Sequence, residues 1–191
     1  MALDQQVDTV DDVLLQLYAN GDQDAARQLT IRLAPRAYAQ AFRMLGSAAD
    51  AEDVAQEAMM RVWKIAPEWR RGDAKVTTWL YRVTANLCTD RLRKRVSVPL
   101  DSVAEPADPT MSAEERLQQA ARLDALQLAL NTLPDRQRQA VVLRHIDGLA
   151  NPEIAIILEV GVEAVESLTA RGKRALTAAL AGQKDALGYK G

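Results

Sequence analysis

Cysteine, histidine and glycine-rich loops are scarce in this chain of 191 residues, and each scarcity excludes a class of protein. The single cysteine, Cys88, excludes an intramolecular disulfide, and with the single histidine, His145, it leaves no cluster that could bind zinc. We expect Cys88 to be a small buried residue and His145 to lie near a helix end. Without a loop that could cradle a nucleotide, the sequence predicts neither an enzyme nor a bound cofactor.

Long apolar runs are also absent, so the sequence predicts no membrane span. The acidic residues 1–13 lack the basic, then apolar, order of a signal peptide. We therefore expect a soluble cytoplasmic protein. Aromatic residues make up only 4% of the chain, while Ala, Leu, Arg, Gln and Glu dominate, which favours helices over strands.

Turn and capping residues predict an all-α protein made of two small helical domains. The expected helices span 10–19, 23–45, 48–66, 76–95, 113–130, 135–146, 152–158 and 162–180, with Asp22, Ser47 and Asn151 as caps. Residues 96–112 contain three prolines and several acidic side chains, which is typical of a flexible linker. We therefore predict one domain at 10–95 and a second at 113–180.

The net charge of −2 conceals a strong charge pattern. Residues 61–95 carry ten basic and three acidic side chains, a net +7, whereas residues 1–60 and 96–135 carry −6 and −5. A basic block between acidic ones can hold a phosphate backbone locally, although a solvated charged surface is an equally good explanation of the pattern alone.

The helix expected at 76–95 has two contrasting faces. One is apolar, formed by Val76, Leu80, Val83, Leu87 and Leu92. The other is polar and positive, formed by Thr78, Arg82, Asn86, Thr89 and Arg93. With Trp63, Trp69, Trp79 and Tyr81 nearby, this segment suits single-stranded nucleic acid. Burial in the core is the better explanation of Trp63 and an equal alternative for Trp79.

Residues 151–180 have the spacing of a helix-turn-helix, with a short helix, a three-residue turn and a longer second helix. Val165, Leu168, Leu176 and Ala179 are expected on its inner face. Ser167, Arg171, Lys173 and Arg174 are expected on its outer face, where they can contact phosphates or bases. An ordinary helical hairpin is the alternative.

An acidic helix start at 50–57 is a third candidate site. The helix dipole explains Asp50, Glu52 and Asp53 sufficiently, because carboxylates near a helix N-terminus are stabilised. Gln56 and Glu57 lie further along the helix and are better candidates for contact with a partner.

These segments together resemble the extracytoplasmic-function (ECF) sigma factors of bacterial RNA polymerase. The stretches AADAEDVAQE (48–57) and WRRGDAKVTTWLYRVTANLCTDRLRKR (69–95) resemble sigma region 2, and LPDRQRQAVVLRHIDGLANPEIAIILEVGVEAVESLTARGKRAL (133–176) resembles region 4. The resemblance covers most of residues 10–180 in the order that the family has. It implies binding to core polymerase and promoter DNA, control by an anti-sigma factor, and a monomer when free.

The resemblance also implies roles for individual residues. It places Asp53, Gln56 and Glu57 on the surface that binds core polymerase. The implied contacts to the promoter −10 element are Arg70, Arg71, Gly72, Asp73, Lys75, Trp79, Arg82, Asn86, Arg91, Arg93 and Lys94. The implied contacts to the −35 element are Glu166, Ser167, Arg171, Lys173 and Arg174.

Three positions depart from the family pattern. Glu166 stands where the family often has a basic residue, and its carboxylate would repel phosphate but can accept a hydrogen bond from a cytosine amino group. In the turn, Glu159 stands at a usual glycine and Gly161 at a usual serine, which caps a helix somewhat better. These departures affect the −35 sequence more than the mode of binding.

Two alternatives remain open from the residues. One is an autonomous helix-turn-helix regulator that binds duplex DNA without polymerase, against which the basic helix and its aromatic-flanked loop argue. The other is a decoy that only sequesters an anti-sigma factor, for which the +7 segment would be unnecessary.

Overall fold

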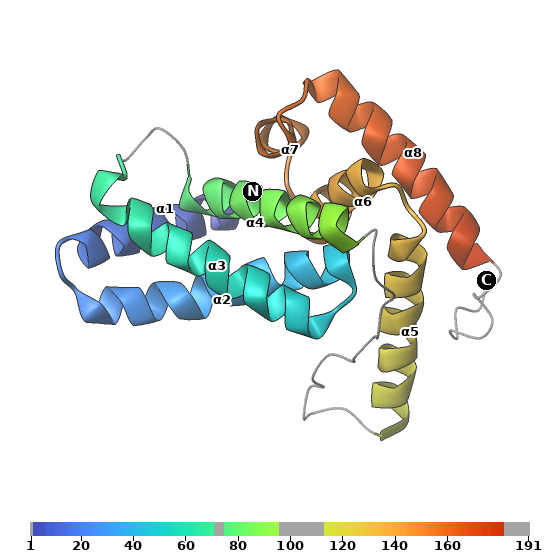
Figure 1. The fold of residues 1–191 in the computed structure, drawn as a ribbon, viewed down its shortest axis with the longest axis horizontal. Helices are drawn as coiled ribbons and strands as arrows, with labels where there is room; N and C mark the ends of the chain where they lie inside the picture. The colour runs from blue at the N-terminus through green and yellow to red at the C-terminus, as the bar shows by residue number, and fades with distance from the viewer. Residues whose placement is uncertain (1, 71–74, 96–112, 182–191) are drawn as a thin grey trace.

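A computed structural model gives the fold of residues 2–70, 75–95 and 113–181, and every regular element within those ranges is a helix (Figure 1). This confirms the predicted all-α class with two helical halves. The expected linker, 96–112, lies outside the described residues.

The first half consists of α1 (Ala2–Ala19), α2 (Gln23–Leu45), α3 (Ala48–Ile65), the short 3₁₀ turn η1 (Ala66–Glu68) and α4 (Val76–Arg95). The predicted caps are confirmed: the Asp22 carboxylate accepts from the N–H groups of Asp24 and Ala25, at 2.9 and 3.0 Å. Ser47 Oγ accepts from Asp50 N at 3.3 Å. Gly46 ends α2 with φ 66°, a left-handed conformation that costs glycine little.

The core of the first half lies where α1, α2, α3 and α4 meet. Leu15, Leu29, Leu33, Val62 and Leu80 are fully buried there. The hydrophobic effect on these side chains is the main force that holds the four helices together.

One buried charge joins α1 to α2. The Asp11 carboxylate is fully buried and pairs with the guanidinium groups of Arg32 and Arg36. A buried carboxylate requires such partners because an unpaired charge in the core is costly.

The second half consists of α5 (Ala113–Asn131), α6 (Asp135–Val141), the π-helical turn η2 (Val142–Ile146), α7 (Asn151–Leu158) and α8 (Val162–Ala181). Pro134 precedes α6, and Gly148, at φ 75°, follows η2, as the sequence predicted. Leu130, Leu133, Val141 and Val142 form one buried cluster. Figure 1 shows the N-terminal end of α5 projecting away from the other helices.

The two halves pack directly against each other. Arg138 of α6 is 6% exposed, and its Nη1 donates to the Met44 carbonyl at the end of α2, at 2.5 Å. Gln127 Nε2 of α5 donates to the neighbouring Arg43 carbonyl at 3.2 Å. On the other side, Tyr81 and Ala85 of α4 are buried with residues of α6, α7 and α8.

The structure corrects four details of the prediction. Helix α1 begins at Ala2 rather than Val10. Ala150, not Asn151, caps α7, with Glu153 Oε2 accepting from Ala150 N at 3.0 Å. The helix expected at 135–146 changes to π geometry at Val142. Ala179 is exposed rather than on the inner face of α8, where buried Gly172 lies instead.

Candidate nucleic-acid and partner interfaces

Helix α4 presents part of the basic surface that the sequence predicted. Arg82, Asn86, Arg93 and Lys94 are exposed along it, and exposed Arg70 lies ahead of it, after η1. Three further residues were expected to contact the −10 element from the loop before α4. They are Arg71, Gly72 and Asp73, and they lie outside the described residues. The exposed cations and amide can reach a phosphate or a base edge.

The polar face of α4 is less open than the sequence predicted. Thr78 is buried, and Thr89 is half-buried with its Oγ1 accepting from Gln139 Nε2 at 2.9 Å. The prediction of an exposed polar face was wrong for these two residues. At Thr89 the second half of the chain contacts α4, which a pattern within one helix cannot reveal.

Trp79 is half-buried and packs against the core of the first half. Its ring meets that of Trp69 edge to face, with centroids 6.2 Å apart. Trp63 packs in the same cluster and meets the Tyr18 ring edge to face at 4.6 Å. The core explanation is therefore confirmed for Trp63, and Trp79 also contributes to the core.

Arg91 of α4 pairs with carboxylates of α3. Its Nη1 lies 2.9 Å from Asp50 Oδ1 and 3.3 Å from Asp53 Oδ2, both at the start of α3. The pairing partly neutralises the charge of two predicted contact residues. Arg91 was predicted to contact DNA, and Asp53 was predicted to contact polymerase.

Lys75 and Arg82 pair with carboxylates of the helix-turn-helix. Lys75 Nζ lies 3.4 Å from Glu153 Oε1 of α7, and the Arg82 guanidinium donates to the Glu159 carboxylate just after α7. Both acids come from the far half of the sequence, so no pattern within 61–95 could reveal these pairs.

The outer face of α3 is polar. Glu52, Asp53, Gln56 and Glu57 are all exposed on it, and Glu57 pairs with Arg61 one turn later, at 2.7 Å. The three predicted polymerase-binding residues therefore lie together on one accessible face.

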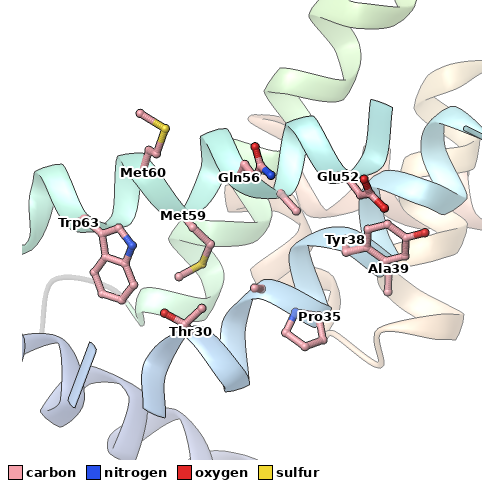
Figure 2. Close-up of a pocket in the computed structure, with 11 residues that line it drawn as sticks. Thr30, Pro35, Tyr38, Ala39, Glu52, Gln56, Met59, Met60 and Trp63 are labelled. Atoms are coloured by element: carbon pink, nitrogen blue, oxygen red, sulfur yellow. The ribbon is translucent and has the colours of Figure 1, made fainter. Parts of the chain in front are cut away.

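An apolar groove of about 1000 Å³ runs beside this face, between α2 and α3 (Figure 2). Met59, Met60 and Trp63 lie toward one end, and Tyr38, Ala39 and Glu52 toward the other. Met60 is 69% exposed, which is unusual for a large apolar side chain. The sequence analysis missed this groove because its walls come from two helices. The adjacent methionines Met59 and Met60 were the available signal, since methionine is common at binding surfaces.

Helix α8 follows the helix-turn-helix prediction closely. Val165 is fully buried against α6 and α7, and Glu166, Ser167, Arg171, Lys173 and Arg174 are all exposed. Arg171 Nε donates to the Ser167 carbonyl at 3.3 Å. The exposed face can enter a major groove because it carries cations and short polar groups on one side.

The turn of this motif contains an unusual backbone conformation. Glu159 has φ 55°, the only positive φ of a non-glycine residue in the part of the chain that the structure describes. The left-handed region is disfavoured for a residue with a side chain.

Cys88 and His145, the single cysteine and the single histidine, lie apart from any candidate metal cluster in the described residues. Cys88 is fully buried, as predicted, and burial raises the pKa of its thiol to about 12. His145 is exposed, and partial desolvation, with Lys173 and Arg144 nearby, lowers its pKa.

Within 2–70, 75–95 and 113–181, no three His, Cys, Asp or Glu residues are grouped to hold a metal ion. None of the helices in these ranges has the length and apolar character of a membrane span.

Two family models match the two halves of the chain and define its class. "Sigma-70 region 2" matches residues 29–97, and "Sigma-70, region 4" matches residues 123–176. A protein with these two regions, in this order, is of the sigma-70 type.

Similar proteins narrow the class to a family. "ECF RNA polymerase sigma factor SigW" of Bacillus subtilis is 34% identical over 82% of this chain and 89% of its own length. SigE of Mycolicibacterium smegmatis is 36% identical over 83% of this chain, which spans 63% of that relative. Among solved structures, CnrH in complex with the cytosolic domain of CnrY has a TM-score of 0.67, 29% identity, and coverage of 91% of this chain and 98% of CnrH. The chain belongs to the ECF RNA polymerase sigma factors.

Proposed function

We propose that this protein is a transcription initiation factor that binds core RNA polymerase and directs it to promoters through their −10 and −35 elements. The observation that carries the proposal is that α4 and α8, in separate halves of one chain, each carry exposed basic side chains. A single helix-turn-helix regulator would need only the second face.

Core polymerase binds the outer face of α3 in this proposal, through Asp53, Gln56 and Glu57. The adjacent apolar groove supports it, because stable protein interfaces combine an apolar centre with a polar rim. Glu52 and Glu57 give the rim an acidic character, which favours a partner segment that carries arginine or lysine beside apolar side chains.

The −10 element binds along α4 and the loop before it. Arg70, Lys75, Arg82, Arg91, Arg93 and Lys94 supply positive charge for the strand, and exposed Asn86 supplies an amide that can recognise a base. The proposed set also includes Arg71, Gly72, Asp73 and Trp79.

The −35 element binds α8 in the major groove. Arg171, Lys173 and Arg174 hold phosphates or guanines, and Ser167 contributes a hydroxyl. Exposed Glu166 discriminates by accepting a hydrogen bond from cytosine N4, which shifts the preferred sequence relative to relatives with a basic residue there.

An anti-sigma factor holds the protein inactive until a signal releases it. The similarity to CnrH, solved in complex with the cytosolic domain of CnrY, supports this regulation. A factor that works on polymerase and promoter DNA acts in the bacterial cytoplasm, and two modules joined in one chain gain affinity by effective concentration.

Run-off transcription with core polymerase and a library of promoter fragments tests the proposal. The parent protein should select one promoter class, and core polymerase alone should select none. A Gln56→Ala, Glu57→Ala variant should lose core binding in a pull-down, whereas Gln119→Ala with Asp124→Ala, exposed on α5, should retain it.

The same reagents separate the two alternatives. Tight, specific binding of duplex promoter DNA without polymerase would identify an autonomous regulator. Binding to an anti-sigma factor, with neither core binding nor a promoter-specific transcript, would identify a decoy.

A further inference from the structure

We propose that Asp12 of α1 is a positioning residue for recognition of the −10 element. Its carboxylate caps the start of α4 from outside that helix and fixes the first turn, which carries the proposed DNA contacts Lys75 and Trp79. This inference rests on the proposed −10 role of α4. It extends the site to α1, a helix without a predicted contact to DNA or polymerase.

The residue at the cap position of α4 cannot cap the helix. The Lys75 carbonyl accepts the first hydrogen bond of α4, from Trp79 N at 3.1 Å, so Lys75 occupies the cap position. An ammonium group has donors only and cannot accept from the free N–H groups at a helix start. The Lys75 ammonium lies instead 3.4 Å from a Glu153 carboxylate oxygen of α7. An acceptor for the first turn of α4 must therefore come from another residue.

Asp12 supplies such an acceptor from α1. Its Oδ1 accepts from the N–H of Val76, the first residue of α4, at 2.9 Å and from 64 positions away in the sequence. The bond is partly buried, so water competes with it less than at an exposed cap. The carboxylate also lies at the positive end of the helix dipole, which stabilises its charge. Asp12 therefore does for α4 what a residue at the cap position normally does.

Helix α1 is itself held firmly enough to serve as an anchor. Asp11, the residue before Asp12, is fully buried and pairs with Arg32 and Arg36 of α2. The Val76 side chain is fully buried in the same apolar cluster as leucines of α1. The two adjacent carboxylates therefore tie α1 both to α2 and to the start of α4.

The chain is also anchored where the −10 contacts begin. The Trp69 and Trp79 rings meet edge to face, with centroids 6.2 Å apart, and both pack against the core. Arg70 follows Trp69, and Lys75 precedes Val76, so both cations are attached to points that the core and Asp12 hold in place. Groups that are preorganised in this way lose less conformational entropy when a strand binds.

Loss of the cap should weaken −10 binding without preventing folding. Without its acceptor the first turn of α4 frays, and the strand binds only those molecules in which the turn is formed. The usual effect of replacing a capping aspartate by alanine corresponds to about three- to tenfold in an equilibrium constant. Asparagine keeps a side-chain oxygen and caps as well as aspartate does. Asp12→Ala should therefore reduce strand affinity about three- to tenfold, and Asp12→Asn should restore most of it.

Strand binding by holoenzyme, assembled from core polymerase and each variant, tests the proposal. The probe is a labelled single strand with the −10 sequence of a promoter that the parent holoenzyme transcribes, and a strand of scrambled sequence is the reference. In Asp12→Ala the affinity for the −10 strand should fall, and the ratio of the two affinities should fall with it. Asp12→Asn should stay within about twofold of the parent on both strands.

Asp22→Ala is the matched control. Asp22 also caps a helix of the first half, α2, by accepting from the N–H groups of Asp24 and Ala25. Its loss should lower the urea midpoint of unfolding by a similar amount to Asp12→Ala, because both remove one cap. Strand affinity should nevertheless stay within about twofold of the parent, and core binding in a pull-down should match the parent in all three variants.

Amide hydrogen exchange examines the cap without DNA or polymerase. Exchange of the Val76 amide should be several-fold faster in Asp12→Ala than in the parent, because its acceptor is gone. Asp12→Asn and Asp22→Ala should leave that rate near the parent value.

Unchanged exchange at Val76, or parent-like strand affinity in Asp12→Ala, would overturn the positioning role. Equal losses of strand affinity in Asp12→Ala and Asp12→Asn would also overturn it, since the charge and not the cap would then matter. Equal losses in Asp12→Ala and Asp22→Ala would do the same by indicating general destabilisation. A parent holoenzyme that binds both strands equally would instead contradict the proposed function.

Discussion

Asp147, at the end of η2, is a buried carboxyl with an unusual environment. Its Oδ2 accepts no hydrogen bond from the described residues, and burial raises the pKa of the carboxyl from 3.8 to about 6. The positive charge of Arg43 opposes this shift without cancelling it. At neutral pH the protein therefore holds an ionised carboxylate in surroundings that stabilise the charge less well than water does.

The raised pKa of Asp147 makes the free energy of unfolding depend on pH. Because the folded-state pKa lies above the unfolded one, the contribution is fully present below pH 4 and is lost as the pH rises through about 6. The loss is about 3 kcal/mol, since one pKa unit corresponds to roughly 1.4 kcal/mol. Asp147→Asn removes this loss. Its effect on the free energy of unfolding, measured in urea titrations, should therefore be about 2–3 kcal/mol more favourable at pH 7.5 than at pH 4.

The control for this prediction is Asp124→Asn, an exposed carboxylate on α5. It should change stability little at either pH. Identical effects of Asp147→Asn at both pH values would show that the carboxyl is hydrated in solution.

At the scale of the element, α8 depends on a glycine. Gly172 is buried at the crossing of α8 over α6, between the exposed residues Arg171 and Lys173. A Cβ at this position would lie 2.6 Å from Val141 Cγ2 and 3.1 Å from the Gln137 carbonyl oxygen. The glycine thus sets the distance between the DNA-facing helix and the helix that supports it.

Gly172→Ala should destabilise the protein by about 1–3 kcal/mol, because overpacking at a close helix crossing outweighs the better helix propensity of alanine. Thermal or urea unfolding measures the change. Val141→Ala in the same chain removes the nearer clash and should recover part of the loss.

Gly161→Ala is the steric control for this substitution, because its added Cβ would meet nothing within 4 Å. Since Gly161 precedes α8 at the cap position, the change should cost less than about 1 kcal/mol. Equal stability of the Gly172→Ala variant and the parent would mean that α8 moves away from α6 at no cost.

The helices were predicted well where local chemistry determines them. Asp22 and Ser47 cap α2 and α3 because their short oxygen-bearing side chains reach the first free N–H groups. Gly46 ends α2 because it adopts a left-handed conformation with little strain. The early start of α1 and the π turn at Val142 were missed, since no capping or glycine signal marks either position.

At the scale of the whole molecule, transcription requires both DNA faces at once. Asn86 on α4 and Arg171 on α8 are exposed on the two halves, and neither lies on the outer face of α3. Asn86→Ala and Arg171→Ala should each reduce promoter-specific run-off transcription. Loss of one base or phosphate contact costs roughly 1–3 kcal/mol, which corresponds to about 5- to 150-fold in affinity.

Core binding should be unchanged in both variants, as measured by pull-down. Promoter substitutions separate the two further: Arg171→Ala should lose discrimination at the −35 element only, and Asn86→Ala at the −10 element only. Parent-like transcription by both variants would contradict the assignment of the DNA faces.

The sequence by itself determined most of the helices, the caps of α2 and α3, the basic segment at 61–95 and the exposed face of α8, because these depend on spacing and charge within one segment. Tertiary structure alone decided that Thr78 is buried, that Arg91 pairs with Asp50 and Asp53, and that α2 and α3 leave a groove between them. It also decided that Glu153 and Glu159 meet Lys75 and Arg82. The physical reason is that each of these features joins residues from separate helices, and only packing brings those helices together.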